Sequence, residues 1–338
     1  MGSDSDGDKV QRRRLLAPRT AFTQMWRERA WRYIPISVLL VVIVVLGAYV
    51  PYFLTTRNVI NVLRQASTLG FMAMGMTIVL IAGGIDISIP AVMALSGILG
   101  ATHMANGGHP LAGVLIMVLI GAALGSINGI AVAYLKMVPF VVTLSMMAIA
   151  TGASVWLTRN VSVSGLPLEF IDAIVGSTAG VPNPVYFVAI GAAILWVIMK
   201  RSMVGRWLYA VGVNARTAEV CGVPRRWIIF GTYAMSGFLA GVTAILVTAR
   251  LESASPTMGE EGVVLNVIGA AVVGGASIYG GIGSSAGAVI GAIFITLITN
   301  SMNMMHIPYH TTLIVKGLVI IAFVASDSLN RKRTAGRI

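Results

Sequence analysis

Hydrophobic and polar positions along this chain fall into long blocks. Apolar runs with almost no charge recur over nearly the whole length, separated by short polar or glycine-rich breaks. A helix needs about 20 apolar residues to cross the hydrocarbon core of a bilayer, so each run is a candidate span. The ten candidates are 33–54, 66–82, 89–105, 111–135, 140–158, 184–199, 228–249, 263–279, 284–300 and 311–325. The pattern predicts an all-α, polytopic membrane protein with about ten transmembrane helices.

Composition supports this class. Of 338 residues, 57% are hydrophobic and only 11% are charged, whereas a soluble domain is about 25% charged. We expect a transmembrane domain over 33–325, preceded by a tail, 1–32, whose polar composition predicts disorder, and followed by a tail, 326–338. A short surface helix is expected around 168–175, in the longer polar segment 159–183. Glycines at small-xxx-small spacing, such as Gly121 and Gly125, predict close helix packing in lipid.

The basic residues are clustered, and this predicts orientation. Segments 1–32, 200–227 and 326–338 hold 18 of the 24 Lys and Arg residues behind the net charge of +12. Nucleic-acid binding would require a basic folded domain, which the pattern does not contain. The positive-inside rule instead places all three segments, and both termini, in the cytoplasm. The four histidines and the single cysteine, Cys221, have no metal-ligand spacing.

The sequence Gly83-Gly84-Ile85-Asp86-Ile87-Ser88 places a carboxylate between two apolar segments. An ionisable group at membrane depth costs about 2.5–3.5 kcal/mol on insertion scales and usually has a function. Asp86 or Ser88 is expected to cap the next helix, with Pro90 in its first turn, and a direct role in a transport pathway is compatible with this. A second glycine turn runs from Gly274-Gly275 to Gly280-Gly281. It suggests a repeat of broken helix pairs, in which the paired glycines have a structural role.

Segment 200–227 is too polar to span a membrane. Asn214 is a good helix N-cap, and Gly222 followed by Pro224 is a good stop, so a short helix is expected over 215–221. A helix of two turns does not hold in water alone. It must pack either on its own membrane domain or on a cytoplasmic partner.

The chain resembles the ribose-type sugar permeases of bacterial ATP-binding-cassette importers, from about Arg57 to Val324. The order and spacing of several short segments carry the resemblance. They are 83–88, Asn128-Gly129, 139–144, Gly205-Arg206 through Gly222-Val223, 249–251 with Pro256-Thr257, Gly274-Gly275 and Lys316-Gly317.

This resemblance implies a bacterial inner-membrane complex. It implies two permease copies, identical or not, two ATPase subunits that bind ATP and Mg, and a periplasmic or extracellular sugar-binding protein. The permease itself has no cofactor and is not an enzyme, and the sequence contains no phosphate-binding glycine-lysine loop. Segment 200–227 then supplies a coupling helix for the ATPase. The candidate coupling residues are Gly205, Arg206, Asn214, Ala218, Glu219 and Gly222.

A sugar pathway needs polar lining, because each unpaired hydroxyl costs about 1–3 kcal/mol in a dry environment. The polar candidates within spans are Asp86, Ser88, Asn128, Thr143, Ser145, Asn266, Asn300 and Asn303. Each of them also fits a hydrogen bond between helices. Lys316 lies mid-span in the last helix and needs a partner, for which Asp86 is one candidate. Val264 and Asn266 occupy positions where the family often has acidic residues. The identity of the sugar is therefore not predicted from the family.

Three other interpretations compete with a sugar importer. The first is a secondary transporter that couples ions through Asp86 or Lys316. The second is an importer of the same type for an amino acid, vitamin or nucleoside. The third is a membrane enzyme, for which no nucleophile, metal set or carboxylate pair recurs at catalytic spacing.

Overall fold

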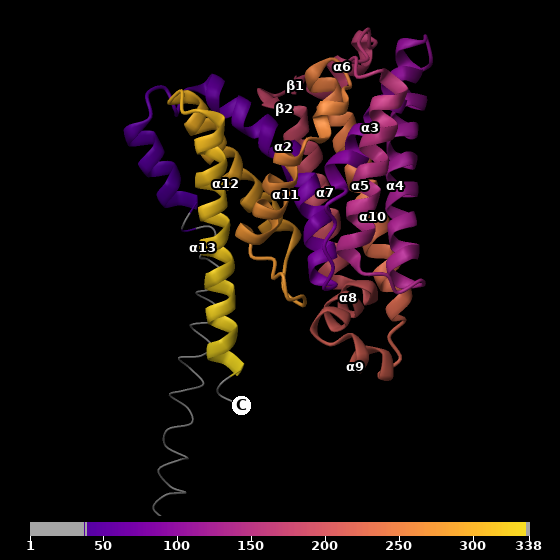
Figure 1. Cartoon of the computed structure of the whole chain (residues 1–338). Helices are drawn as coiled ribbons and strands as arrows, with labels where there is room; N and C mark the ends of the chain where they lie inside the picture. Colours follow the sequence, from indigo (N-terminus) through magenta and orange to yellow (C-terminus); the bar gives the residue numbers. More distant parts are fainter. Residues whose placement is uncertain (1–36, 38, 336–338) are drawn as a thin grey trace, which may run out of the picture.

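The computed structural model describes residue 37 and residues 39–335, which form a bundle of long helices (Figure 1). The predicted tail 1–32 and the start of the first predicted span lie outside the described residues. In chain order the elements are a helix Leu39–Tyr49, α2 Thr56–Ile81, α3 Ile89–Ala105, α4 Pro110–Ala133, α5 Pro139–Thr158, α6 Leu168–Val175, β1 Ser177–Thr178, β2 Val181–Pro182, α7 Asn183–Arg201, α8 Met203–Val213, α9 Ala215–Val220, α10 Arg225–Leu251, the 3₁₀ turn η1 Pro256–Gly259, α11 Glu261–Val273, α12 Ser285–Met304 and α13 Tyr309–Ala335.

Helix α2 is the centre of the bundle. Every residue from Ala66 to Ile81 is buried, and the helix packs on α7, α10, α11 and α12. Helix α4 lies at the periphery and exposes a row of leucines, Leu111, Leu115 and Leu119. Because these side chains point away from the bundle at helical spacing, they are the surface expected to face lipid.

Glycines permit the closest helix contact. A Cβ at Gly121 would overlap the carbonyl of Gly237, and a Cβ at Gly125 would overlap that of Tyr233, so α4 and α10 pack backbone to backbone. The same holds between α11 and α12, where Gly287 lies against the carbonyl of Gly274. The predicted role of the small-xxx-small spacing is therefore confirmed.

Six helices among the described residues are long and apolar enough to cross a membrane: α2, α4, α5, α7, α10 and α12. The predicted count of ten is therefore not confirmed. The other predicted spans have shorter apolar helices: Leu39–Tyr49, α3 with 17 residues, α11 with 13, and the apolar part of α13, Tyr309–Ala325. Helix α11 ends at Val273 and not at 279, because the glycine turn begins there. Helix α13 continues through Ala335, ten residues past the predicted end of the span.

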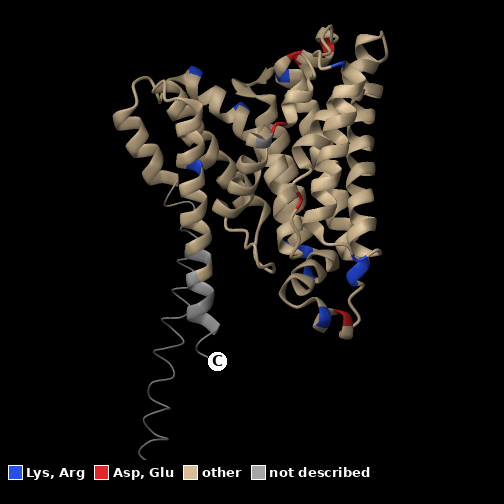
Figure 2. Cartoon of the chain, viewed as in Figure 1, with Lys and Arg blue, Asp and Glu red and all other residues tan. Residues whose placement is uncertain are grey.

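Charge divides the bundle into two ends (Figure 2). Basic residues gather at the end formed by α8, α9 and the start of α10, called the α9 end below. Acidic residues, among them Glu169 and Asp172 of α6, gather at the opposite end, which also carries several basic residues. This asymmetry is the pattern on which the positive-inside rule operates. The assignment of the α9 end to the cytoplasm stays a prediction.

The predicted surface helix at 168–175 is confirmed as α6, with the same bounds. After it, β1 and β2 form a short antiparallel hairpin that the all-α expectation did not include. Helix α8 was also not expected, because its 11 residues are neither long enough for a span nor polar enough for a loop.

Candidate functional site

Asp86 lies in the turn between α2 and α3, and its side chain is only 1% exposed. Its Oδ1 accepts hydrogen bonds from the Ser88 backbone N–H (3.1 Å) and the Ser88 hydroxyl (2.6 Å). Its Oδ2 accepts one from the Ser236 hydroxyl of α10 (2.8 Å). The Asn128 amide of α4 donates to Ser88 Oγ (2.9 Å). The carboxylate therefore ties this turn to α4 and α10.

Neither predicted role of Asp86 describes this geometry fully. Ser88 occupies the N-cap position of α3, with Pro90 in the first turn, but its side chain makes no capping hydrogen bond. Asp86 itself has no ion pair within the described residues, and the candidate partner Lys316 makes none with it. Lys316 is 2% exposed on α13, which packs on α11 and α12.

Two more of the predicted polar residues bond within the bundle. The Thr143 hydroxyl donates to the Pro139 carbonyl of its own helix (3.0 Å). Asn300 of α12 pairs with Asn58 of α2 through two amide hydrogen bonds of 2.9 and 3.0 Å. The Asn58–Asn300 pair holds α2 and α12 together in an apolar environment, while the Thr143 bond lies within α5.

Ser145, Asn266 and Asn303 are less enclosed. Ser145 on α5 and Asn303 on α12 are exposed, while Asn266 on α11 is half-buried and its Oδ1 has no hydrogen-bond partner. An open apolar cleft of about 240 Å³ separates α5 from α11 near the start of α3. Its lining residues are Ile87, Met147, Val264, Leu265 and Ile268.

The two predicted glycine turns meet in space. The Gly281 N–H donates to the Ile81 carbonyl at the end of α2 (2.9 Å). A Cβ at Gly280 would lie 2.6 Å from the carbonyl of Gly212 on α8 and 3.4 Å from the Cα of Gly83. Gly83 and Gly280 have φ of 82° and 86°, a left-handed conformation that favours glycine. The end of α2, the second turn and α8 thus form one contact.

Helix α9 follows α8 directly, at the tip of the bundle (Figure 1). Asn214 caps it, because its Oδ1 accepts hydrogen bonds from the N–H groups of Arg216 (3.1 Å) and Thr217 (3.0 Å). Gly222 ends the turn with a φ of 81°. The predicted cap and stop are confirmed, and the helix ends one residue earlier than expected.

The candidate coupling residues face different ways. Ala218 is buried against the chain's own domain, and Gly205 is buried where α8 packs against the Met199 carbonyl. Arg206 and Glu219 are exposed. Glu219 forms an ion pair with Arg225 at 3.6 Å, which ties α9 to the start of α10.

Sequence reasoning missed the apolar part of this surface. Val213 at the end of α8 and Val220 at the end of α9 are 77% and 84% exposed, and both lie at the charged tip rather than on the lipid-facing wall. The signal was available in the sequence as two valines next to the predicted caps.

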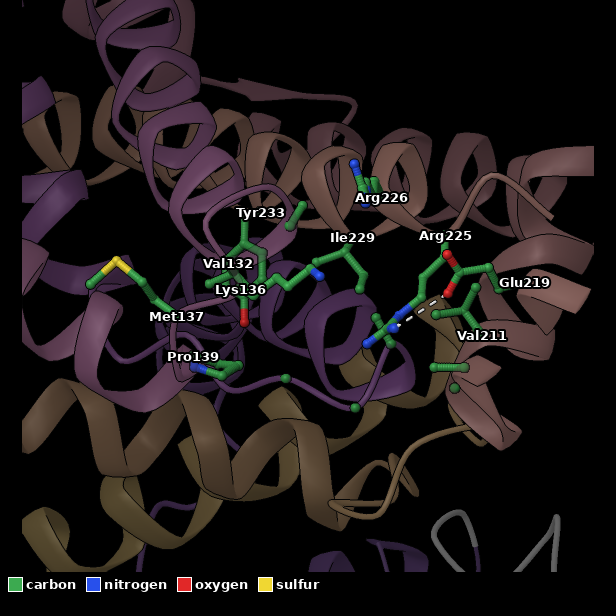
Figure 3. A pocket seen from close by; sticks show the side chains of 16 residues that line it. Val132, Lys136, Met137, Pro139, Val211, Glu219, Arg225, Arg226, Ile229 and Tyr233 are labelled. Carbon is green, nitrogen blue, oxygen red and sulfur yellow. Dashed lines mark ion pairs between the residues drawn. The ribbon is translucent and has the colours of Figure 1, made fainter. Parts of the chain in front are cut away.

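A cavity of about 500 Å³ opens beside α9 (Figure 3). Its walls come from the first glycine turn, the end of α4, the α4–α5 loop, α8, α9 and the start of α10. Its charged lining consists of Lys136, Arg225, Arg226 and Glu219.

The helical bundle with a lipid-facing wall and a buried polar turn defines a polytopic membrane protein. Residues 58–324 match the family described as branched-chain amino acid transport system / permease component. The match covers well over half of the chain, so the chain belongs to this permease family.

Characterised relatives agree with this assignment. The D-allose transport system permease protein AlsC of Escherichia coli (strain K12) is 36% identical over 303 residues, 89% of this chain and 93% of the relative. The ribose import permease protein RbsC of Haemophilus influenzae is 34% identical over 299 residues, 86% and 91% of the two chains. RbsC of Escherichia coli (strain K12) is 33% identical over 314 residues, 92% and 97%. No solved structure matches the chain. The resemblance to ribose-type permeases is confirmed.

Proposed function

We propose that this chain is the membrane-spanning subunit of an ATP-driven importer that moves a monosaccharide into a bacterial cell. The family description refers to branched-chain amino acids, but the three relatives above are named for allose and ribose. Their similarity extends over nearly the whole chain, and this supports a sugar as cargo. ATP hydrolysis belongs to two partner ATPase subunits, and an extracytoplasmic binding protein delivers the sugar.

The observation that carries the proposal is the surface of α9. A six-residue helix is too short to be stable alone, yet this one is fully capped and held at the tip by the Glu219–Arg225 pair. Only Ala218 of its residues is buried, while Val220 at its end and Val213 just before its cap are exposed. A capped, exposed helix with apolar residues at both sides suits insertion into a groove of a cytoplasmic ATPase.

The contacts behind α9 provide a route into the membrane. Helix α8 directly precedes α9, and its Gly212 contacts the second glycine turn. In that turn, the Gly281 N–H donates a hydrogen bond to the Ile81 carbonyl at the end of α2. Five residues further along lies Asp86, with its bonds to α4 and α10. A displacement of α9 therefore acts on the turns between α2 and α3 and between α11 and α12.

The cleft between α5 and α11 is the proposed wall of the pathway, completed by a second copy of the permease. All five side chains that line it are apolar. Such a wall provides no tight site for a sugar, and the polar lining that the pathway also needs has to come from its other walls, because each unpaired hydroxyl costs about 1–3 kcal/mol. We assign Asp86 and Asn300 to packing, because Asp86 is bonded to Ser88 and Ser236 and Asn300 is paired with Asn58. Asn128 donates its amide to Ser88 Oγ, while its Oδ1 has no hydrogen-bond partner.

The test is co-purification of the tagged chain with candidate ATPase subunits encoded in the same organism. Val220→Asp places a charge on the α9 surface, and Val161→Asp makes the same change at an exposed residue between α5 and α6. We expect Val220→Asp to reduce the recovered ATPase about tenfold or more and Val161→Asp to leave it unchanged. Equal recovery with both variants would contradict docking through α9.

A further inference from the structure

The cavity beside α9 has a charge pattern that the transport of a neutral sugar does not require. Three basic side chains, Lys136, Arg225 and Arg226, line it, against a single carboxylate, Glu219. Figure 3 shows Lys136 and Arg225 extending into the same space from different elements, while Arg226 lies apart. Lys136 comes from the α4–α5 loop, and Arg225 from the start of α10.

A second, independent feature also points to a ligand. Tyr233 of α10 lines the cavity and is 1% exposed. Its phenol oxygen lies near the Ile85 backbone and the Asp86 carboxylate, and its O–H group can donate to an oxyanion on the wall of a cationic cavity. Gly84 provides the space, because a Cβ there would overlap this oxygen.

We propose that this cavity is a binding site for a phosphate group, carried either by an anionic lipid headgroup or by a soluble phosphate ester. A guanidinium and an ammonium from two elements match the several oxygens of a phosphate. The volume of about 500 Å³ leaves room for a small polar group attached to it. The cavity lies at the basic end, where both sources of phosphate are within reach if that end is cytoplasmic.

The site is linked to α9 through one side chain. Arg225 forms its ion pair with Glu219 at 3.6 Å, and both side chains line the cavity. An anion in the cavity competes with Glu219 for the same guanidinium. Occupancy therefore loosens the tie between α9 and α10 and changes how the docking surface is held. This inference goes beyond the proposed transport function, because it concerns a different ligand at a different place.

The experiment uses the full chain in nanodiscs of neutral phosphatidylcholine, with binding followed by native mass spectrometry. In one arm, phosphatidylglycerol is added, with phosphatidylcholine of the same acyl chains as the control. In the other, inorganic phosphate and a hexose 6-phosphate are added, with the free hexose as the control. Retention in the first arm identifies a headgroup, and retention in the second identifies a soluble ester.

Substitutions distinguish specific anion binding in the cavity from nonspecific attraction to exposed basic residues. Lys136→Gln and Arg225→Gln each remove one cation and are expected to weaken binding about tenfold. Glu219→Gln removes the competing carboxylate and is expected to strengthen it, a change that mere loss of structure does not produce. Arg201→Gln is the matched control, because Arg201 is exposed at the same end and does not line the cavity.

The proposal is overturned if neither arm gives a bound anion, or if Arg201→Gln weakens binding as much as Lys136→Gln. Arg225→Gln also removes the ion pair with Glu219 and can therefore disturb α9. Lys136 has no ion pair within the described residues, so Lys136→Gln tests anion binding without that effect. A negative result here leaves the transport proposal intact, because that proposal depends on ATPase docking and sugar uptake.

Discussion

At the scale of single residues, one buried carboxylate organises the centre of the protein. Removing a carboxylate from water costs several kcal/mol, and Asp86 recovers this through three short hydrogen bonds and not through a cation. The donors come from its own turn and from α10, so the charge fixes where two helices and a turn meet. In this arrangement Asp86 acts as a structural cross-link.

Asp86→Ala tests that role. The substitution leaves the hydroxyls of Ser88 and Ser236 without their acceptor, so we expect a loss of about 1–3 kcal/mol in the free energy of unfolding. The measurement is the thermal unfolding midpoint of the purified chain in nanodiscs. Ser145→Ala is the control, because that exposed hydroxyl bonds only to the Val141 carbonyl of its own helix. Unchanged stability together with lost transport would instead assign Asp86 to the solute pathway.

Residue roles were only partly predictable from the sequence. The Asn214 cap and the Gly222 stop depend on local backbone chemistry, and local rules identified both. The burial of Ala218 and the distance between Lys316 and Asp86 depend on tertiary packing, which no local pattern encodes. The polar pairs, such as Asn58 with Asn300, join residues 242 positions apart.

At the scale of elements, boundaries were predictable where proline or glycine marks them. Helices α3 and α6 begin and end at the predicted residues, next to Pro90 and Gly176. Helix α2 begins ten residues earlier than expected. Its first turns carry polar side chains such as Arg57 and Arg64, so the apolar pattern did not include them. Thr55 caps it by accepting from the Asn58 N–H, a local signal that hydropathy does not include.

The contact between α8 and the glycine turns is the element-level link on which the account depends. A Cβ at Gly212 would overlap the Ile81 carbonyl and lie 2.6 Å from the Gly281 nitrogen. Backbone atoms on both sides leave little room to relax, so overpacking is expected to cost about 1–3 kcal/mol. We predict that Gly212→Ala lowers the unfolding midpoint and uncouples ATP hydrolysis from uptake in the assembled complex.

Gly231→Ala provides the matched control for this prediction. Gly231 lies in α10, and no neighbouring atom comes within 4 Å of the place a Cβ would take, so alanine fits there without overlap. The expected midpoint is unchanged or slightly raised, since alanine is the better helix former. If the two variants behaved alike, close contact at Gly212 would not be part of the coupling route.

At the scale of the whole molecule, the account requires that the α9 end faces the cytoplasm. Cys221 is the single cysteine of the chain, and it is exposed beside α9. A membrane-impermeant maleimide should therefore label it in inside-out vesicles and not in intact spheroplasts. As the control, Val161→Cys in a Cys221→Ser background should reverse the pattern, because α5 runs from the cavity at Pro139 to the opposite end. Labelling of Cys221 in spheroplasts would invert the orientation.

The broad class of the protein was predictable from composition and periodicity, while its internal geometry was not. Hydropathy identified a helical membrane protein and the resemblance identified the permease family. The meeting of residues 81–83, 212 and 280–281 depends on how distant helices pack, so it appears only in the structure.

Sugar uptake by proteoliposomes distinguishes an ATP-driven importer from an ion-coupled transporter. Radiolabelled ribose and allose are offered to vesicles containing either the chain alone or the chain with its ATPase subunits and binding protein. The account predicts uptake of a monosaccharide only by the full assembly and only with ATP. Uptake by the chain alone, driven by an ion gradient and indifferent to ATP, would contradict it and identify a secondary transporter.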